Sequence, residues 1–290
     1  MSYVVDNAII MAAGLSSRFA PLSYEKPKAL INVRGEILIE RQIRQLKQAG
    51  IDDIFLVAGY KKEMFYYLQE KFGVHILENP EYAVRNNNSS LYVARDLLKN
   101  TYICSADNYF TVNPFEKEVD ESYYAAVFSE GPTKEWCIEH DENDWITNVT
   151  IGGKDSWYMM GHVFFSEKFS QKFAKILCDE YEWQETKDKL WENIYIEHID
   201  ELPMKIKKYN TEDIYEFDSL DELRQFDKKY WEQSGSFIMQ EIAKQLNCKE
   251  EQLTCLAPVK DYRSQIAGVS FQLNEIKYQY MYESKKIIES

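Results

Sequence analysis

A glycine- and serine-rich turn near the N-terminus is followed by two cations and could bind an anion such as phosphate. Residues 8–13 are continuously apolar and, with Asn7, predict a buried strand that ends at Gly14. A turn directly after a buried strand can point several backbone N–H groups at one anion, and small residues let that anion approach closely. Arg18 and Lys28 would add positive charge. The alternative is an ordinary surface loop with two solvated cations, since short motifs also recur by chance.

Three carboxylates follow or end two further predicted strands. Asp107 comes after the predicted strand 101–106, a position where aspartate is also common as a turn or capping residue. Glu216 and Asp218 are two residues apart in another predicted strand, so they would share a face, or else be solvent-facing acids of an edge strand. Carboxylate oxygens are ligands that Mg²⁺ prefers, together with phosphate oxygens. The sequence leaves open whether residue 107 lies near residues 216 and 218.

Composition and charge exclude several classes of protein. The 290 residues, 45% hydrophobic and 28% charged, are typical of a globular chain that buries a sizeable core. The net charge of −14 argues against general binding to nucleic acids or anionic membranes. No stretch approaches the roughly 20 apolar residues of a membrane span, and no signal-peptide pattern opens the chain, so we expect a cytoplasmic protein. The five cysteines are widely spaced without a Cys-X-X-Cys pair, which indicates reduced thiols.

Strand and helix patterns alternate over about the first 110 residues, as in parallel sheets with right-handed crossovers. Ligands of such sheets bind beyond the carboxyl ends of the strands. The turn at residues 14–28 and Asp107 both follow strand ends, so we expect them on one rim. Strands are predicted at 7–13, 53–58, 74–77 and 101–106, and helices at 38–49, 63–72 and 90–98.

From residue 121 the pattern becomes antiparallel. Turn signals at Gly131-Pro132 and Gly152-Gly153 separate short predicted strands. A capping box, Ser219 to Glu222, opens a helix that runs to about residue 231. The remaining predicted elements are strands at 123–129, 136–140, 145–151, 157–165, 204–209 and 214–218 and helices at 167–180 and 187–198.

Several motifs, in order along the chain, resemble one superfamily of nucleotidyltransferases. AAGLSSRFAPLS with KPKAL, then SADNY and YEFDS, are similar to stretches of enzymes that join a nucleoside triphosphate to a small phosphorylated molecule. Three more stretches, RNNNSSLYVARDLL, KEW and LWENI, resemble the bacterial CTP:phosphocholine cytidylyltransferases. The resemblance covers roughly residues 5–231, so we expect a nucleotidyltransferase domain over residues 1–231.

The resemblance implies an α/β fold with a Rossmann-like mixed, mainly parallel sheet flanked by helices and an antiparallel acceptor-binding subregion. It implies that CTP and phosphocholine give CDP-choline and pyrophosphate, with Mg²⁺ as cofactor. Positioning and electrostatic stabilisation suffice for such an in-line displacement, so no nucleophilic serine or cysteine is required. The matching residues are Ala12, Gly14 and Ser17 for the nucleotide, Asn87 and Ser90 near the pyrimidine, Arg18 and Lys28 for catalysis, and Asp107, Glu216 and Asp218 for the metal.

The acceptor end of the resemblance contains one departure. A trimethylammonium group has no N–H to donate, so a choline site needs aromatic faces and a negative charge. Trp136 matches the family's tryptophan wall, or is a half-buried strand aromatic, and Glu192 matches a family aspartate. Leu190 stands where the family has a tyrosine, for which Trp191 or Tyr195 would have to compensate. A smaller acceptor, phosphoethanolamine or 2-aminoethylphosphonate, therefore stays open.

Residues 236–290 lie beyond this resemblance. Residues 233–236 predict a linker, 237–246 an amphipathic helix, and 269–273 and 276–282 strands, which together make a small C-terminal α+β extension. The stretch weakly resembles the start of a choline-kinase-like lobe but lacks the glycine-rich turn of such lobes. We expect it to serve in docking a partner or in homo-oligomer formation and not as a kinase.

Two other functions compete with cytidylyl transfer to a phosphorylated amine. A non-catalytic nucleotide sensor or scaffold would be favoured by loss of Lys28, Asp107 or Asp218, and all three are present. An enzyme for sugar-1-phosphates would need polar groups that read hydroxyls. The stretches KEW and LWENI offer aromatics and acids instead, so a phosphonate is the stronger alternative acceptor.

Overall fold

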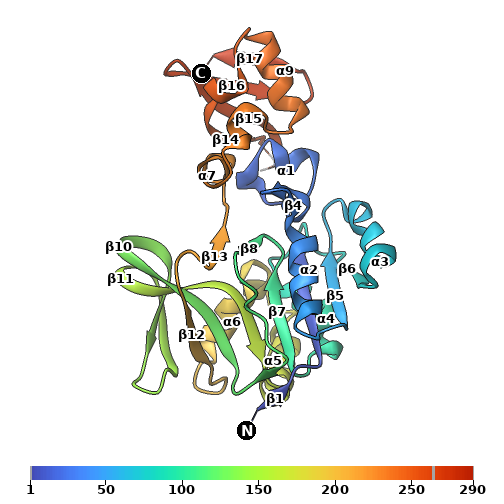
Figure 1. The fold of residues 1–290 in the computed structure, drawn as a ribbon, viewed down its shortest axis with the longest axis vertical. Helices are drawn as coiled ribbons and strands as arrows, with labels where there is room; N and C mark the ends of the chain where they lie inside the picture. Colours follow the sequence, from blue (N-terminus) through green and yellow to red (C-terminus); the bar gives the residue numbers. More distant parts are fainter. Residues whose placement is uncertain (1, 263–264, 290) are drawn as a thin grey trace. The chain divides into compact units, whose positions relative to one another are not determined.

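The computed structural model describes residues 2–262 and 265–289. Its contacts divide the chain into two compact units. The sheet unit consists of Met1–Gly14 and Leu38–Glu216, and the loop unit consists of Leu15–Ile37 and Phe217–Ser290. Figure 1 labels the helices and strands of both units.

A seven-stranded sheet forms the centre of the sheet unit, in the order β12-β10-β11-β7-β2-β5-β6 (Figure 1). β2 pairs in parallel with β5 and β7, and β5 in parallel with β6, as the alternating pattern predicts. β11 pairs antiparallel with β7 and β10, so the predicted mixed, mainly parallel sheet is confirmed. The strands are β2 (Asn7–Ala12), β5 (Ile54–Ala58), β6 (His75–Glu78), β7 (Thr101–Ser105), β10 (Tyr123–His140), β11 (Ile146–Phe165) and β12 (Lys205–Tyr209). Two small pairs accompany them, β1 (Tyr3–Val4) with β9 (Glu118–Val119) and β8 (Asn108–Phe110) with β13 (Ile214–Glu216).

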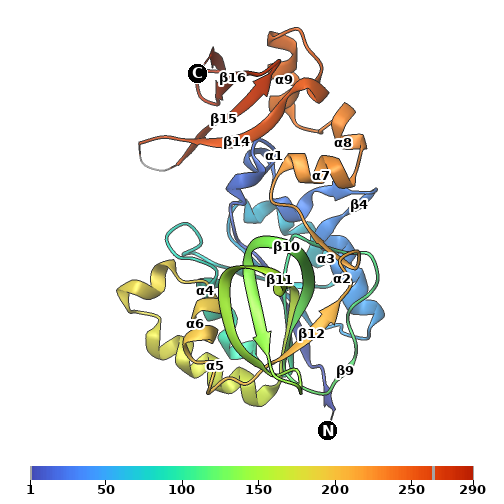
Figure 2. The ribbon, with the colours of Figure 1, turned by 90° about the vertical axis from the view of Figure 1, so that its left-hand side faces the viewer.

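Helices α4, α5 and α6 bury one hydrophobic cluster together with the sheet (Figure 2). Leu91, Phe173 and Ile194, one from each helix, are fully buried in it. Apolar residues recur three or four positions apart in these helices, which places them on one side. The helices of the unit are α2 (Leu38–Gln48), α3 (Tyr67–Phe72), α4 (Asn88–Ala94), α5 (Glu167–Glu180) and α6 (Trp191–Glu197), with 3-10 turns η3 (Lys62–Phe65), η4 (Arg95–Leu97) and η5 (Gln184–Asp188).

The antiparallel region differs from its prediction. The four predicted strands between residues 123 and 165 are two long ones, β10 and β11, of 18 and 20 residues. The predicted turn residues Gly131-Pro132 and Gly152-Gly153 lie near one another across this ladder, where Pro132 pairs with Lys154 and Thr133 with Gly153. Register shifts on either side absorb them as irregularities of the ladder, so the strands continue through both turn signals.

The loop unit combines a segment near the N-terminus with the C-terminal part of the chain. Residues 15–37 form short helical turns and a small hairpin, namely η1 (Ser17–Phe19), α1 (Leu22–Glu25), η2 (Lys28–Leu30), β3 (Asn32–Val33) and β4 (Glu36–Ile37). The C-terminal part holds α7 (Leu220–Phe226), α8 (Lys229–Glu232), α9 (Phe237–Gln245), η6 (Glu250–Gln252) and the antiparallel sheet β14 (Thr254–Lys260), β15 (Ile266–Leu273), β16 (Ile276–Met281) and β17 (Lys286–Glu289). Strand β14 packs against η1 within this unit.

The boundary between the two units does not coincide with the predicted boundary at residues 231–236. The structure groups residues 217–231 with the C-terminal extension, and the predicted linker contains two buried serines, Ser234 and Ser236. The domain assignment from sequence stays a prediction about which segment carries the transferase. Among the described residues, no helix has the length and apolar character of a membrane span.

Candidate active site

The carboxyl ends of two neighbouring strands form the first part of the candidate site. β2 ends at Ala12, and β7 lies beside it in parallel register, with Met11 opposite Ser105. The backbone N–H of Ala106 donates to the Met11 carbonyl at 3.2 Å, which extends the pairing one residue further. Ala12 and Asp107 therefore lie on the same rim of the sheet.

The pairing of β8 with β13 brings two of the three predicted metal ligands together. Glu216 lies opposite Asn108, the residue that follows Asp107 in the chain. These strands are about 100 residues apart in sequence, which is why the sequence left the proximity open. β13 ends at Glu216, so the prediction that Asp218 shares its strand face is wrong. Asp218 belongs to the loop unit.

Asn108 is a buried residue of the candidate site to which the sequence analysis gave no role. It is 2% exposed, and neither its amide nitrogen nor its amide oxygen has a hydrogen-bond partner among the described residues. Buried polar groups are nearly always paired, so the unpaired amide of Asn108, which follows Asp107 and faces Glu216, indicates a place for a polar ligand. The sequence signal was the Asp-Asn pair directly after a buried strand. In the described part of the chain, no group of three or more His, Cys, Asp or Glu residues could hold a metal by itself.

Glu192, at the start of α6, is the centre of a second polar group in the sheet unit. Its carboxylate accepts hydrogen bonds from the Asn87 amide and the Tyr124 hydroxyl, both at 3.2 Å. Burial raises the pKa of Glu192 to about 7, although both hydrogen bonds favour the ionised form. Asn87 also accepts a hydrogen bond from the backbone N–H of Trp191 at 2.7 Å. Asn87, predicted to lie near the pyrimidine, thus orients Glu192, which was predicted to bind the acceptor.

The sequence analysis also gave no role to Tyr124, whose hydroxyl donates to Glu192. Burial raises its pKa well above the usual range, and the negative charges of Glu192 and Glu216 act in the same direction. Its ring stacks on Trp191 with 5.8 Å between centroids and 11° between planes. Trp191 is 1% exposed within the hydrophobic cluster, so its indole supports Tyr124 from the core side.

The other predicted residues of the sheet unit differ in exposure. Trp136 on β10 and Leu190, just before α6, are both half-buried. Ser90 in α4 is buried, and its hydroxyl accepts a hydrogen bond from Asn79 at 3.2 Å. Gly14 is exposed at the end of the unit's first segment.

Both predicted catalytic cations lie in the loop unit. The Arg18 guanidinium forms an ion pair with the Asp218 carboxylate at 2.6 Å. The backbone N–H of Asp218 donates to Glu222 at 2.7 Å, so the predicted capping box orients this acid. Lys28 is 5% exposed, and its ammonium lies 5.8 Å from the centroid of the Phe19 ring. Ser17 begins the same turn as Arg18.

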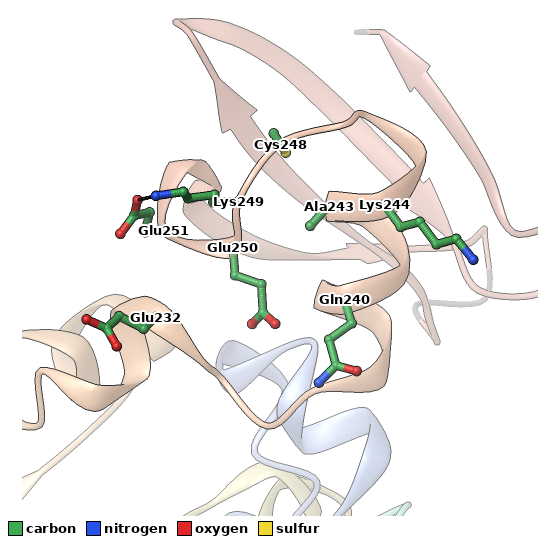
Figure 3. Close-up of a pocket in the computed structure, with 8 residues that line it drawn as sticks. All are labelled: Glu232, Gln240, Ala243, Lys244, Cys248, Lys249, Glu250 and Glu251. Atoms are coloured by element: carbon green, nitrogen blue, oxygen red, sulfur yellow. Dashed lines mark hydrogen bonds and ion pairs between the residues drawn. The ribbon is translucent and has the colours of Figure 1, made fainter.

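Two surface pockets lie apart from the predicted site residues. One, of about 470 Å³, follows β5 and β6 and is lined by Gly59, Tyr60, Lys61, Lys62, Glu63, Glu78, Asn79, Pro80 and Tyr82. The other, of about 490 Å³, lies in the loop unit and is drawn in Figure 3. Its lining side chains carry both signs of charge, the glutamates Glu232, Glu250 and Glu251 and the lysines Lys244 and Lys249, and Lys249 forms an ion pair with Glu251 at 3.3 Å (Figure 3).

Known proteins share this combination of elements. A model of the MobA-like NTP transferase domain matches residues 8–130. The choline-phosphate cytidylyltransferase of Streptococcus pneumoniae is 35% identical over 221 residues, which are 76% of this chain and 96% of that protein. The chain belongs to this cytidylyltransferase family.

Other members and structures define how far the likeness extends. The 2-aminoethylphosphonate cytidylyltransferase of Lancefieldella rimae is 38% identical over 228 residues, 77% of this chain and 93% of that protein. The solved structure of the CTP:phosphocholine cytidylyltransferase of Streptococcus pneumoniae has a TM-score of 0.75 and covers 78% of this chain. The inositol-1-phosphate CTP transferase of T. maritima shares the fold alone, at 15% identity and a TM-score of 0.60. This cytidylyltransferase family member is thus a nucleotidyltransferase enzyme.

Proposed function

We propose that the protein transfers the cytidylyl group of CTP to phosphocholine and releases CDP-choline and pyrophosphate. The observation that carries this proposal is the pairing of β8 with β13, which sets Asp107 and Glu216 at the rim where β2 ends. In a chain of the cytidylyltransferase family, a carboxylate pair at that rim fits the metal-assisted reaction of a nucleoside triphosphate.

The proposed reaction is a displacement at the α-phosphorus of CTP. A phosphate oxygen of the acceptor forms a new bond to that phosphorus, the bond to the β-phosphate oxygen breaks, and pyrophosphate leaves with the electron pair. Arg18 would hold the leaving phosphates, and Lys28 would stabilise the charge on the α-phosphate and the attacking oxygen. Ala12, Gly14 and Ser17 would contact the nucleotide, with Asn87 and Ser90 near the pyrimidine.

The carboxylates fit a divalent cation. Asp107, Glu216 and Asp218 offer hard oxygen donors, and the unpaired Asn108 amide beside the first two adds a polar group without a protein partner among the described residues. Mg²⁺ held there would neutralise negative charge on the phosphate oxygens. Because Arg18 and Asp218 bind one another, the proposed roles require this ion pair to open when the nucleotide binds.

The acceptor group would bind between an aromatic face and a carboxylate. Trp136 would contact the trimethylammonium group through its ring, and Glu192 would supply the countercharge. Tyr124 and Asn87 hold the Glu192 carboxylate, and Trp191 supports Tyr124 by stacking. Cytoplasmic location, expected from the sequence, would give the enzyme access to CTP.

One observation favours a second acceptor, 2-aminoethylphosphonate. The member of the family named for that substrate is 38% identical to this chain, and Leu190 replaces an aromatic residue expected for choline. A primary ammonium donates hydrogen bonds, so it needs fewer aromatic contacts than a trimethylammonium group.

Pyrophosphate release with CTP and Mg²⁺ tests both candidates. Phosphocholine, phosphoethanolamine, 2-aminoethylphosphonate and glucose-1-phosphate are compared at equal concentrations, with Asp107→Ala as the inactive control. Turnover highest with phosphocholine and lost in the control supports the proposal. Highest turnover with the phosphonate assigns the second acceptor, and no turnover with any acceptor or nucleoside triphosphate contradicts cytidylyl transfer.

A further inference from the structure

One side chain joins the segment that carries Arg18 and Lys28 to the N-terminus of helix α9 in the C-terminal part of the chain. Glu25, the last residue of α1, accepts hydrogen bonds at one carboxylate oxygen from the Ser236 hydroxyl at 2.6 Å and the Ile238 N–H at 2.9 Å. Its other oxygen accepts from the Phe237 N–H at 3.1 Å. These N–H groups belong to the first turn of α9. The first N–H groups of a helix have no partner within the helix, and the helix dipole favours negative charge at that end.

Ser236 completes the cap and leads into a chain of buried polar contacts. It is 0% exposed, and its hydroxyl oxygen also accepts from the Met239 N–H at 3.1 Å. Its own N–H donates to the Ser234 hydroxyl, which donates to the Glu250 carboxylate. A network of buried hydrogen bonds stabilises the fold most when every polar group in it has a partner. Removing the group at one end therefore weakens the remaining hydrogen bonds.

Arg224, in α7, binds the segment that contains Glu250, the last residue of this series of hydrogen bonds. Helix α7 begins shortly after Asp218. Arg224 is 0% exposed, and its guanidinium donates to the backbone carbonyls of Leu253 at 2.6 Å and Glu250 at 3.0 Å and to the Asp221 carboxylate at 3.2 Å. Asp221 lies in the first turn of α7, directly after the acid that binds Arg18. The polar contacts thus run from the turn before Lys28 to the helix beside Asp218, all within the loop unit.

The segment itself has little backbone pairing of its own. Between Gly14 and Lys28 the described residues form η1, of three residues, and α1, of four. The strands that follow, β3 and β4, have two residues each. Such short turns are marginal alone, so side-chain contacts must order them. Tyr24, next to Glu25, adds a ring contact with Tyr282 at 4.0 Å between centroids.

We propose that Glu25 is a positioning residue for nucleotide binding. By capping α9 it holds the segment with Arg18 and Lys28, so the C-terminal extension sets the affinity for the triphosphate. This inference rests on the proposed function where it assigns those two cations to the nucleotide. Glu25 itself contacts neither substrate in the proposed reaction.

The test uses the full chain and the variants Glu25→Ala, Glu25→Gln and Ser236→Ala, with Glu251→Gln as a matched control. Glu251 is an exposed acid of the same unit, and its carboxylate pairs with the exposed Lys249 ammonium at 3.3 Å. Glutamine keeps one acceptor oxygen and replaces the other with a donor that faces the Phe237 N–H, so its effect should be intermediate. Amide hydrogen exchange and steady-state kinetics are measured on each.

The proposal expects faster exchange in Glu25→Ala at two places, residues 237–239 and residues 16–30. It expects the KM for CTP to rise about tenfold, with kcat and the KM for the acceptor within about twofold. Ser236→Ala should show the same pattern at smaller size, and Glu251→Gln should match the wild type.

Two results would overturn the proposal. Faster exchange at residues 237–239 alone, with an unchanged KM for CTP, would make Glu25 a helix cap without effect on the nucleotide segment. Unchanged exchange in every variant would show that the cap does not order either segment. If the wild-type chain lacks turnover, the proposed function fails, while the exchange of residues 16–30 still decides whether Glu25 positions the segment.

Discussion

The sheet unit and the loop unit hold the charged residues of the proposed site by different means. In the sheet unit, Asp107 and Glu216 stand at strand ends, where backbone hydrogen bonds of two ladders set their positions. In the loop unit, Arg18 and Lys28 stand on short helical turns that side chains fasten to the C-terminal part. The Asp227 carboxylate, for example, accepts a hydrogen bond from the Arg34 N–H at 2.8 Å.

The two kinds of support should respond differently to single substitutions. A backbone ladder survives the loss of one side chain, because its hydrogen bonds belong to the main chain. A segment that is held by a few buried polar side chains loses several hydrogen bonds when one of these side chains is removed, and the partner groups stay unpaired. Substitutions of supporting residues should therefore disturb the site through the loop unit more than through the sheet unit.

The largest expected effect compares one charged residue from each unit. Lys28→Met and Asp107→Asn should each lower kcat about 10³-fold, because both would remove charge stabilisation at the reacting phosphates. Pyrophosphate release measures both, and Lys47→Met, at a partly exposed lysine paired with Asp52, is the control. If only one of the two variants lost activity, the proposal that each unit supplies a residue needed for catalysis would be wrong.

A buried arginine provides the next largest effect. Arg224→Leu should lower the free energy of unfolding by about 3 kcal/mol, since it leaves the Leu253 and Glu250 carbonyls without their guanidinium donor. Urea unfolding measures this loss. Arg95→Leu, which removes a half-buried arginine lying over Tyr92 in the sheet unit, should cost below about 1 kcal/mol. Equal losses would contradict the contrast between the units.

The proposed contact of Trp136 with the acceptor is tested inside the sheet unit. Trp136→Leu should raise the KM for phosphocholine about tenfold or more and leave the KM for CTP unchanged, because a leucine face has no quadrupole to attract a trimethylammonium group. Steady-state kinetics with each substrate varied measure the split. Trp183→Leu, at an exposed tryptophan of the same unit, is the control. An unchanged KM for phosphocholine would show that Trp136 is a packing residue of β10.

The smallest expected effect is a pH dependence at Glu192. Its pKa, raised to about 7, means that the carboxylate ionises between pH 6 and 8. The KM for phosphocholine should therefore fall about threefold as the pH rises across this range, and Glu192→Gln should abolish the change. Kinetics at several pH values with one buffer series measure it, and a flat wild-type profile would remove Glu192 from the acceptor site.

The same shift has an opposite sign for stability. The folded protein keeps the Glu192 proton to a higher pH than the unfolded chain, whose glutamates ionise near 4.5. The stabilisation from the protonated form is full below that value and is lost as the pH rises toward about 7. Glu192→Gln should remove this part of the pH dependence in urea unfolding.

Local elements could be predicted well from the sequence. The helix predicted at 167–180 is α5 with the same bounds, and α2 and α9 end within one residue of their predictions. The Ser219 side chain caps α7 as the capping box predicts. Periodicity and caps are properties of a few adjacent residues, so no distant contact is needed to determine them.

Local sequence patterns set which residue types stand at which strand ends, whereas long-range packing set which of these residues come together. Asp107 and Glu216 come together through the long-range pairing of β8 with β13, and the turn signals of β10 and β11 were overridden by an equally long-range ladder. The Glu25 cap joins residues 211 positions or more apart. Pairing between distant segments depends on how the whole core packs, because the free energy of such contacts is set by burial and partners rather than by neighbouring residues in the chain.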